Sequence, residues 1–266
     1  MKKVLFLIPI LAMTVLSGCK KQPENTSSIV DTSEATTSTS ANFEKYYSSI
    51  DSSLTGKDLL NALHSLNTTK TKTLIGYDGM KSKFYKTDPG DSSGQVRSFY
   101  SGKSATYSGN MNREHVWPAS RTRLGRHNDP LEDDMHMVRP TLISENSARG
   151  NAFFTTEGGG GWDPASFDNP SYRGDAARII FYCVVFDIEL ALSDKSSDYT
   201  SNHTMGKLSD LLKWNLEYPI NDRENVRNNE VEKLQGNRNP FIDHPEFACK
   251  IWGDRNDTTR AICGKS

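Results

Sequence analysis

The chain has 266 residues, of which 35% are hydrophobic and 24% are charged, which is enough for one sizeable core or at most two small ones. Its 32 Lys and Arg residues nearly balance 33 Asp and Glu residues, so the formal net charge is -1. This balance excludes a chain that is basic throughout, and any contact with a polyanion must come from a local positive patch.

Residues 1–18 have the pattern of an export signal. Lys2 and Lys3 precede an apolar run that is too short for a membrane-spanning helix, because such a helix needs roughly 20 apolar residues. The run closes with Leu16-Ser-Gly-Cys19, which resembles the bacterial lipobox. The resemblance implies cleavage before Cys19 and a lipid on its thiol, which would anchor the exported protein to the cell membrane. An ordinary secretory signal, with release to the extracellular side, is the alternative.

Residues 19–41 are predicted to form a flexible tether, and residues 42–266 the folded domain. The tether is rich in Ser and Thr and has almost no large apolar residues, so it cannot bury enough surface to fold. Within the domain, Cys183 stands in an apolar run and is expected to be a small buried hydrophobe. Cys249 and Cys263 are candidates for a disulfide, which export would permit.

The first half of the domain is predicted to be irregular, with few regular elements. Residues 54–66 carry leucines at helical spacing and form the first predicted helix. Residues 96–100 form a predicted strand in a stretch that is otherwise broken by Gly and Pro. Residues 111–117 are also predicted to be extended. A polar loop over residues 119–134 then leads to a further strand at residues 135–139.

A helix is predicted to begin at Pro140, since proline suits the first helical position. It continues from Thr141 to Arg149, and Gly150 ends it. Asn146 and Arg149 are three residues apart, so both side chains project from one face of this helix. The local order is therefore strand, loop, strand and helix.

The C-terminal half is predicted to be helical. Residues 173–192 are apolar around most of the helix surface, which is typical of a buried helix at the centre of a core. Residues 205–217 and 221–234 form two more predicted helices. Asp243 and Glu246 have the spacing of a capping box, and we expect them to begin a short helix.

Glu114 and His115 are adjacent at the end of a predicted strand, and Asn146 lies on the helix that follows. A carboxylate oxygen and an amide oxygen together are ligands that Mg²⁺ accepts alongside several waters. A neutral imidazole can take a proton from water near pH 7. Neighbours in a strand point to opposite faces, so Glu114 and His115 serve one site only if the strand ends or bulges there. The pattern predicts a metal-assisted hydrolase of phosphate esters, whereas a histidine packed beside Trp117 is the plainer alternative.

Three stretches of the sequence resemble successive motifs of the endonuclease I family, a group of bacterial non-specific nucleases with a ββα-metal (His-Me) finger. The stretches are Asn112-Arg-Glu-His-Val-Trp-Pro-Ala119, Asp134-Met-His-Met-Val-Arg-Pro140 and Glu145-Asn-Ser-Ala-Arg-Gly-Asn151. The similarity continues through residues 174–182, 211–214 and 235–245. The resemblance implies an α+β fold, in which the finger is embedded in a mainly helical single domain.

The resemblance also implies the site residues. His115 matches the general base of the family. Glu114 and Asn146 match the two ligands of one Mg²⁺ ion, and other divalent metals are alternatives to Mg²⁺. Family members place an arginine beside the scissile phosphate. Arg126 and Arg149 are assigned to substrate binding, and Arg121 and Arg123 are further candidates. Met137 departs from the family pattern, which commonly has His or Asn at this position, and leaves the role of that position open.

The expected activity is Mg²⁺-dependent, non-sequence-specific hydrolysis of DNA, with RNA as the second candidate substrate, by a monomer. His127, His203 and His244 are not assigned to the site. Two alternatives come from other classes of protein. One is an exported metal-dependent phosphodiesterase that acts on a small or lipid ester. The other is a catalytically inactive binding lipoprotein on the same fold, and the presence of Glu114, His115 and Asn146 weighs against it.

Overall fold

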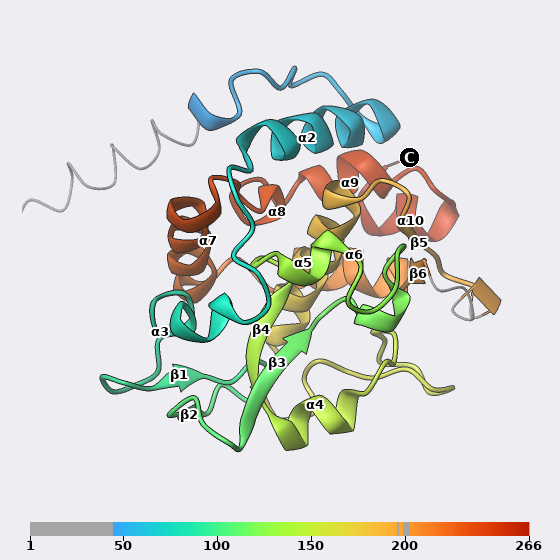
Figure 1. Ribbon diagram of the computed structural model, residues 1–266. Coiled ribbons are helices and arrows are strands. Elements are labelled where there is room, and N and C mark those ends of the chain that lie inside the picture. Colours follow the sequence, from blue (N-terminus) through green and yellow to red (C-terminus); the bar gives the residue numbers. More distant parts are fainter. Residues whose placement is uncertain (1–44, 196, 199–202, 266) are drawn as a thin grey trace, which may run out of the picture. The chain divides into compact units, whose positions relative to one another are not determined.

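The computed structural model describes residues 45–195, 197–198 and 203–265, all within the compact unit Phe43–Ser266. The predicted signal, Cys19 and tether lie outside the described residues. The described part is an α+β domain with small two-stranded sheets, in which β1 to β4 lie in the lower half of Figure 1 and most of the helices lie above them. Its elements are α2 (Gly56–Lys70), η1 (Gly79–Ser82), α3 (Phe84–Thr87), β1 (Val96–Arg97), β2 (Ser104–Ala105), β3 (Met111–His115), η2 (Ala119–Arg121), η3 (Pro130–Asp133), β4 (Val138–Leu142), α4 (Ile143–Arg149), α5 (Tyr172–Phe186), β5 (Ala191–Leu192), β6 (Thr204–Met205), α6 (Leu208–Glu217), α7 (Asp222–Gln235), α8 (Pro240–Asp243), α9 (Phe247–Trp252) and α10 (Asp257–Ile262).

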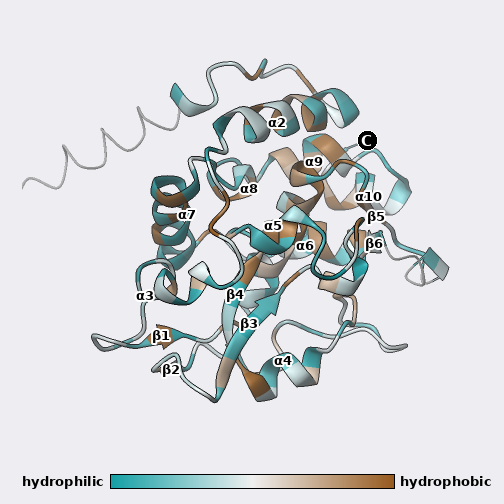
Figure 2. Cartoon of the chain, viewed as in Figure 1, coloured by the Kyte–Doolittle hydropathy of each residue, from teal (hydrophilic) through white to brown (hydrophobic). Residues whose placement is uncertain are grey.

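The core is built around α5, as its apolar sequence predicts. Almost every side chain of this helix is buried, and α2 and α6 pack against it. In Figure 2 the hydrophobic colour is concentrated in inner helices such as α9 and parts of α5, whereas β3 is largely hydrophilic. The helix ends at Phe186, earlier than residue 192, because the chain becomes extended at Asp187. No helix within the described ranges is both long and apolar enough to cross a membrane.

The strand–loop–strand–helix order is confirmed, but its second half is shifted along the chain. β3 and β4 pair antiparallel from Met111↔Leu142 to His115↔Val138, and α4 follows β4 without a loop. The prediction that a helix begins at Pro140 is therefore wrong. Pro140 lies inside β4, and the helix begins at Ile143. A proline cannot donate to a sheet ladder, and here its carbonyl accepts from the Phe99 N–H at 2.8 Å.

Other boundaries also differ from the prediction. The strand at residues 96–100 shortens to Val96–Arg97. The predicted capping box at Asp243 is wrong, because Asp243 ends α8 and its carboxylate is paired with Arg238 at 2.7 Å. Glu246 precedes α9 and makes no side-chain capping bond.

The structure confirms the prediction for Cys183 and decides the question that the sequence left open for Cys249 and Cys263. Cys183 is free and buried. Cys249 and Cys263 form a disulfide with a Cα–Cα distance of 5.6 Å, which joins α9 to the residue that follows α10. This bond closes the C-terminal end of the chain onto the helices that cover α5.

Candidate active site

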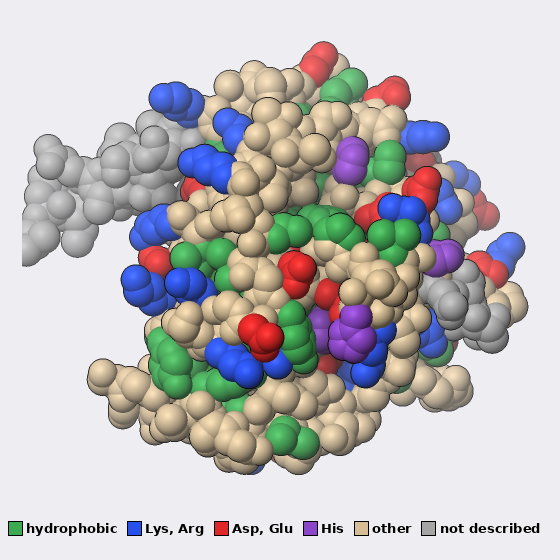
Figure 3. Space-filling model, in the orientation of Figure 1, with side chains coloured by type: hydrophobic (Ala, Val, Ile, Leu, Met, Phe, Trp, Pro, Cys, Tyr) green, Lys and Arg blue, Asp and Glu red, His purple; other side chains and the backbone are tan. Residues whose placement is uncertain are grey.

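The predicted site residues meet in one cavity of about 240 Å³ at the end of β3. Figure 3 shows that histidine, basic and acidic side chains gather near the centre of this face of the molecule. The cavity is lined by Tyr77, Asn112, Arg113, Glu114, His115, Pro118, Ala119, Arg126, His127, Glu132, Asn146, Arg149, Gly150 and Asn151.

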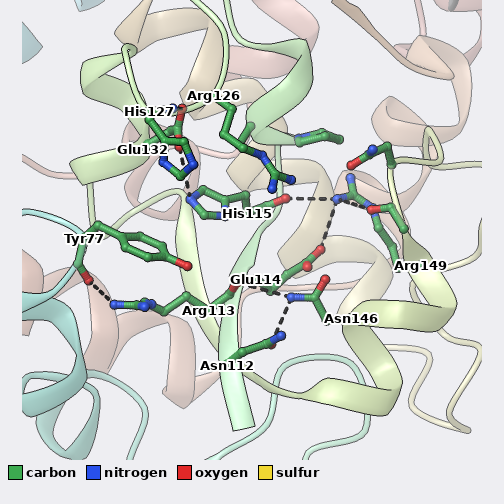
Figure 4. A pocket seen from close by; sticks show the side chains of 14 residues that line it. Tyr77, Asn112, Arg113, Glu114, His115, Arg126, His127, Glu132, Asn146 and Arg149 are labelled. Atoms are coloured by element: carbon green, nitrogen blue, oxygen red, sulfur yellow. Dashed lines mark hydrogen bonds and ion pairs between the residues drawn. The ribbon is translucent and has the colours of Figure 1, made fainter.

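Glu114 and His115 project from opposite faces of β3. Side chains alternate along a strand, so Glu114 points toward α4 and His115 points toward Tyr77 (Figure 4). β3 ends at His115. Both residues line the cavity because it lies at this strand end, which is the geometry that the adjacent pair requires.

Glu114 is a buried carboxylate with fixed partners. Its side chain is 1% exposed, and Oε1 accepts hydrogen bonds from the Tyr100 hydroxyl at 2.6 Å and from Arg149 Nη1 at 3.1 Å. Burial raises the pKa of Glu114, while the Arg149 charge and the Tyr100 hydrogen bond lower it. Arg149 is therefore the main charge that favours an ionised Glu114.

The Asn146 amide is oriented by two acceptors. Its Nδ2 donates to Asn112 Oδ1 at 2.9 Å and to the Arg113 carbonyl at 3.2 Å. Because both acceptors take the nitrogen, the hydrogen-bond network determines which end of the amide is the oxygen. Figure 4 shows this oxygen on the side of the Glu114 carboxylate.

These two oxygens fit a hard cation that keeps several waters. Mg²⁺ is commonly bound in proteins by one or two side-chain oxygens, with water completing its shell. No group of three His, Cys, Asp or Glu side chains in the described part of the chain could hold a metal. A cation bound here would have the Glu114 carboxylate and the Asn146 amide oxygen as side-chain ligands, with water in its other positions.

His115 is held as a neutral imidazole. Burial, and after it the positive charges of Arg126, Arg113 and Arg149, together lower its pKa to about 4. Its ring stacks on Tyr77, with 5.4 Å between ring centroids. Nε2 is buried without a hydrogen-bond partner among the described residues, and it faces Glu132 Oε2 at 3.8 Å. This distance is longer than a hydrogen bond.

The candidate arginines differ sharply in their surroundings. Arg149 is buried, and its guanidinium donates to the carbonyls of His115 at 2.9 Å and Val116 at 2.6 Å as well as to Glu114. Arg126 is exposed, lines the cavity and reaches toward His115 in Figure 4. Arg123 is instead paired with Asp187 at 2.9 Å and does not line the cavity.

Sequence reasoning missed part of the cavity wall. His127, which was not assigned to the site, lines it together with Glu132, and the His127 N–H donates to Glu132 Oε1 at 2.7 Å. The many polar and charged residues between the two motif strands could have indicated that His127 and Glu132 belong to the site. Tyr77, which also lines the cavity, had no such signal, because it lies 35 residues before the first motif in the sequence. Met137 is fully buried, so its departure from the family pattern does not touch the cavity.

A carboxylate, an oriented amide oxygen, a neutral imidazole and an exposed arginine in one polar cavity are typical of hydrolases that act on phosphate esters. A sequence model of the Endonuclease I family matches residues 45–166 and 163–246. The chain thus belongs to the endonuclease I family and is a nucleic-acid hydrolase.

Similar proteins include two from Bacillus. An extracellular ribonuclease of Bacillus amyloliquefaciens is 35% identical over 268 residues, which cover 91% of this chain and 87% of the relative. An extracellular ribonuclease of Bacillus subtilis (strain 168) is 34% identical over 238 residues, 80% of each chain. Endonuclease-1 of Buchnera aphidicola subsp. Baizongia pistaciae is 26% identical over 163 residues, 53% of this chain and 64% of that protein.

Proposed function

We propose that this chain is an exported, Mg²⁺-dependent endonuclease that hydrolyses phosphodiester bonds without sequence preference, with His115 as the general base. The observation that carries the proposal is the Asn146 amide, whose nitrogen is held by two acceptors. Its oxygen is thereby presented beside the Glu114 carboxylate, in the same cavity as a neutral imidazole. In this proposal β3, β4 and α4 form the ββα-metal finger.

Glu114 and Asn146 are the proposed metal ligands. When bound, the cation neutralises charge on the phosphate and on the leaving oxygen. Asn112 and the Arg113 carbonyl keep the Asn146 amide in its ligating orientation, and the Arg149 charge opposes the rise in the pKa of Glu114 that burial causes. These partners orient the proposed ligands and influence their protonation, as residues around metal ligands commonly do.

His115 is the proposed base that deprotonates the attacking water. If Nε2 carries its proton and directs it toward Glu132, then Nδ1 is left with the lone pair that accepts a proton. Arg126 and Arg113 depress the pKa of His115 through their positive charge. A phosphate bound beside Arg126 offsets this charge, so substrate binding raises the basicity of the imidazole at the step where it is used.

Arg126 is the proposed contact to the scissile phosphate. It is exposed at the cavity, and none of the described residues forms an ion pair with its guanidinium. Arg149 is the second assigned arginine, but its Nη1 and Nη2 already donate to protein oxygens. We therefore assign Arg149 to Glu114 and to the end of β3, with any effect on the phosphate passing through Glu114.

The substrate is proposed to include RNA as well as DNA. The proposed groups act on the phosphodiester, which both polymers share, and sequence-independent recognition uses the backbone. Two relatives that cover most of this chain are named ribonucleases, which supports RNA as a substrate. The same relatives are named extracellular, which supports export. Attachment through lipidated Cys19 and a monomeric state complete the proposal, and Cys19→Ser should move the protein from the membrane fraction to the soluble fraction.

The test is cleavage of plasmid DNA and of an unstructured RNA by the purified chain with Mg²⁺ and with EDTA. We expect cleavage of both polymers with Mg²⁺ and none in EDTA. His115→Ala should lower the rate by about 10²-fold or more, whereas His64→Ala, a histidine outside the cavity, should not. Full activity in EDTA would refute the metal assignment, and an unchanged rate in His115→Ala would refute the assignment of the base.

A further inference from the structure

The Tyr77 ring lies between two side chains of β3, Arg113 and His115 (Figure 4). The Arg113 guanidinium carbon is 3.3 Å from the Tyr77 ring centroid. On the other side, the Tyr77 and His115 rings are 5.4 Å apart between centroids and inclined by only 17°. The three groups form a stack, and Tyr77 is its only member from outside β3.

Strand geometry explains why one ring fits between these two side chains. Residues two apart on a strand point to the same face and are roughly 6.5–7 Å apart. Contacts of about 3.5–4 Å on each side of a flat ring fill such a gap. Arg113 and His115 therefore form a slot whose width matches one aromatic ring, and Tyr77 occupies it.

The backbone of Tyr77 is fixed from two directions. Its N–H donates to Asp133 Oδ1 at 2.7 Å, and its carbonyl accepts from Arg113 Nη1 at 2.7 Å. Asp133 belongs to η3, which also contains Glu132, the carboxylate that faces His115 Nε2. The same short helix thus supports the two groups that border the imidazole.

Hydrogen bonding at Nε2 does not fix the orientation of the His115 imidazole. Its Nε2 lies among the buried side-chain atoms that have no hydrogen-bond partner in the described part of the chain. Rotation about the last side-chain bond of a histidine is broad and roughly two-fold. The stack on Tyr77 is a flat contact along the face of this ring, and the plane of the ring decides whether Nδ1 or a carbon edge faces the cavity.

We propose that Tyr77 is a positioning residue, which holds the His115 imidazole in the plane needed for proton transfer, with Arg113 clamping Tyr77 from its other face. This inference rests on His115 being the general base. Tyr77 acts through the imidazole and requires its ring but not its hydroxyl. Arg113 acts one step further away, by keeping the Tyr77 ring in the slot.

A double-mutant cycle tests this route. The rate of RNA or DNA cleavage is measured for Tyr77→Leu, for His115→Ala and for both changes together. We expect Tyr77→Leu to lower kcat by roughly tenfold to a hundredfold, the scale of a misplaced catalytic group, with little change in KM. In the His115→Ala background the same change should cause no further loss, because the group that it positions is already absent.

Three further variants keep the inference open to refutation. Tyr77→Phe retains the ring and should recover most of the rate that Tyr77→Leu loses. Arg113→Met should give a smaller loss, which also disappears in the His115→Ala background, and it covers the case in which Tyr77→Leu does not fold. Tyr85→Leu is the matched control, since Tyr85 is exposed and outside the cavity lining.

The outcomes separate this inference from the proposed function. Equal losses from Tyr77→Leu with and without His115 would overturn the positioning role, because the ring would then act on substrate or on the fold. A rise in KM without a fall in kcat would overturn it as well. If His115→Ala alone keeps the full rate, the proposed function fails, and the positioning inference fails with it.

Discussion

Replacing Arg149 with Met should destabilise the protein by about 3–5 kcal/mol when no divalent cation is bound. The Arg149 and Glu114 side chains are each 1% exposed, and their nearest atoms are 3.1 Å apart. Removing one partner of a buried ion pair leaves an uncompensated charge, which costs about 3–5 kcal/mol. The lost hydrogen bonds to the His115 and Val116 carbonyls act in the same direction.

Urea unfolding in EDTA and in saturating Mg²⁺ measures this effect. For an m-value of about 2–3 kcal/mol per molar, the midpoint in EDTA should fall by about 1–2.5 M. Mg²⁺ should recover part of the loss, since a cation bound to the folded state adds stability and supplies positive charge beside Glu114. Arg123→Met is the control, because the Arg123 side chain is 42% exposed in its ion pair with Asp187 and should cost less than about 1 kcal/mol.

An unchanged midpoint for Arg149→Met would show that the ion pair with Glu114 has no structural importance. If that variant also had a raised KM for nucleic acid, Arg149 would instead be a phosphate contact, as the motif assignment predicts. Arg149→Lys separates charge from geometry: it keeps the charge but loses the forked donors that reach two carbonyls and a carboxylate.

Three more outcomes are expected. Asn146→Ala should weaken Mg²⁺ binding, so that cleavage needs more Mg²⁺ and added Mg²⁺ restores part of the rate. Added Mg²⁺ should not restore His115→Ala, and the opposite pattern would mean that ligand and base are exchanged. Replacing Cys249 and Cys263 together by Ser should lower the free energy of unfolding by about 3 kcal/mol, which is the entropy of closing a loop of about 15 residues. A reducing agent should have no further effect on this variant. Equal stability of the variant and the unchanged protein would contradict the prediction. Burial lowers the pKa of His136 from 6.5 to about 4, so its unfolded form takes up a proton first as the pH falls, and stability should drop by about 3 kcal/mol in total across this window. His136→Gln should remove that part of the slope of unfolding free energy against pH, and an unchanged slope would refute the assignment.

Several features follow from the sequence because they depend on local chemistry. The apolar surface of α5 predicts a buried helix, and a hairpin with α4 follows from the order of extended and helical patterns. Asn146 and Arg149 share a helix face because they are three residues apart, and both line the cavity. Their spacing holds even though the helix begins at Ile143 and not at Pro140.

Other features depend on contacts that no local pattern contains. Pro140 lies in a strand because Arg113, far away in the sequence, pairs with it. Asp243 is paired with a buried arginine and does not cap a helix, since burial of that charge requires a compensating carboxylate.

The division is clearest at the site itself. The sequence by itself determined that a carboxylate, an imidazole and an amide stand at short spacing, and the proposed ligands and base rest on the chemistry of these residue types. Only the tertiary structure decided that Arg149 is occupied by Glu114, that Asn112 orients Asn146, and that Tyr77 stacks on His115. Each of these contacts joins segments that are distant in the chain. Their geometry is set by packing and by the pairing of buried polar groups, which exist only once the core has formed.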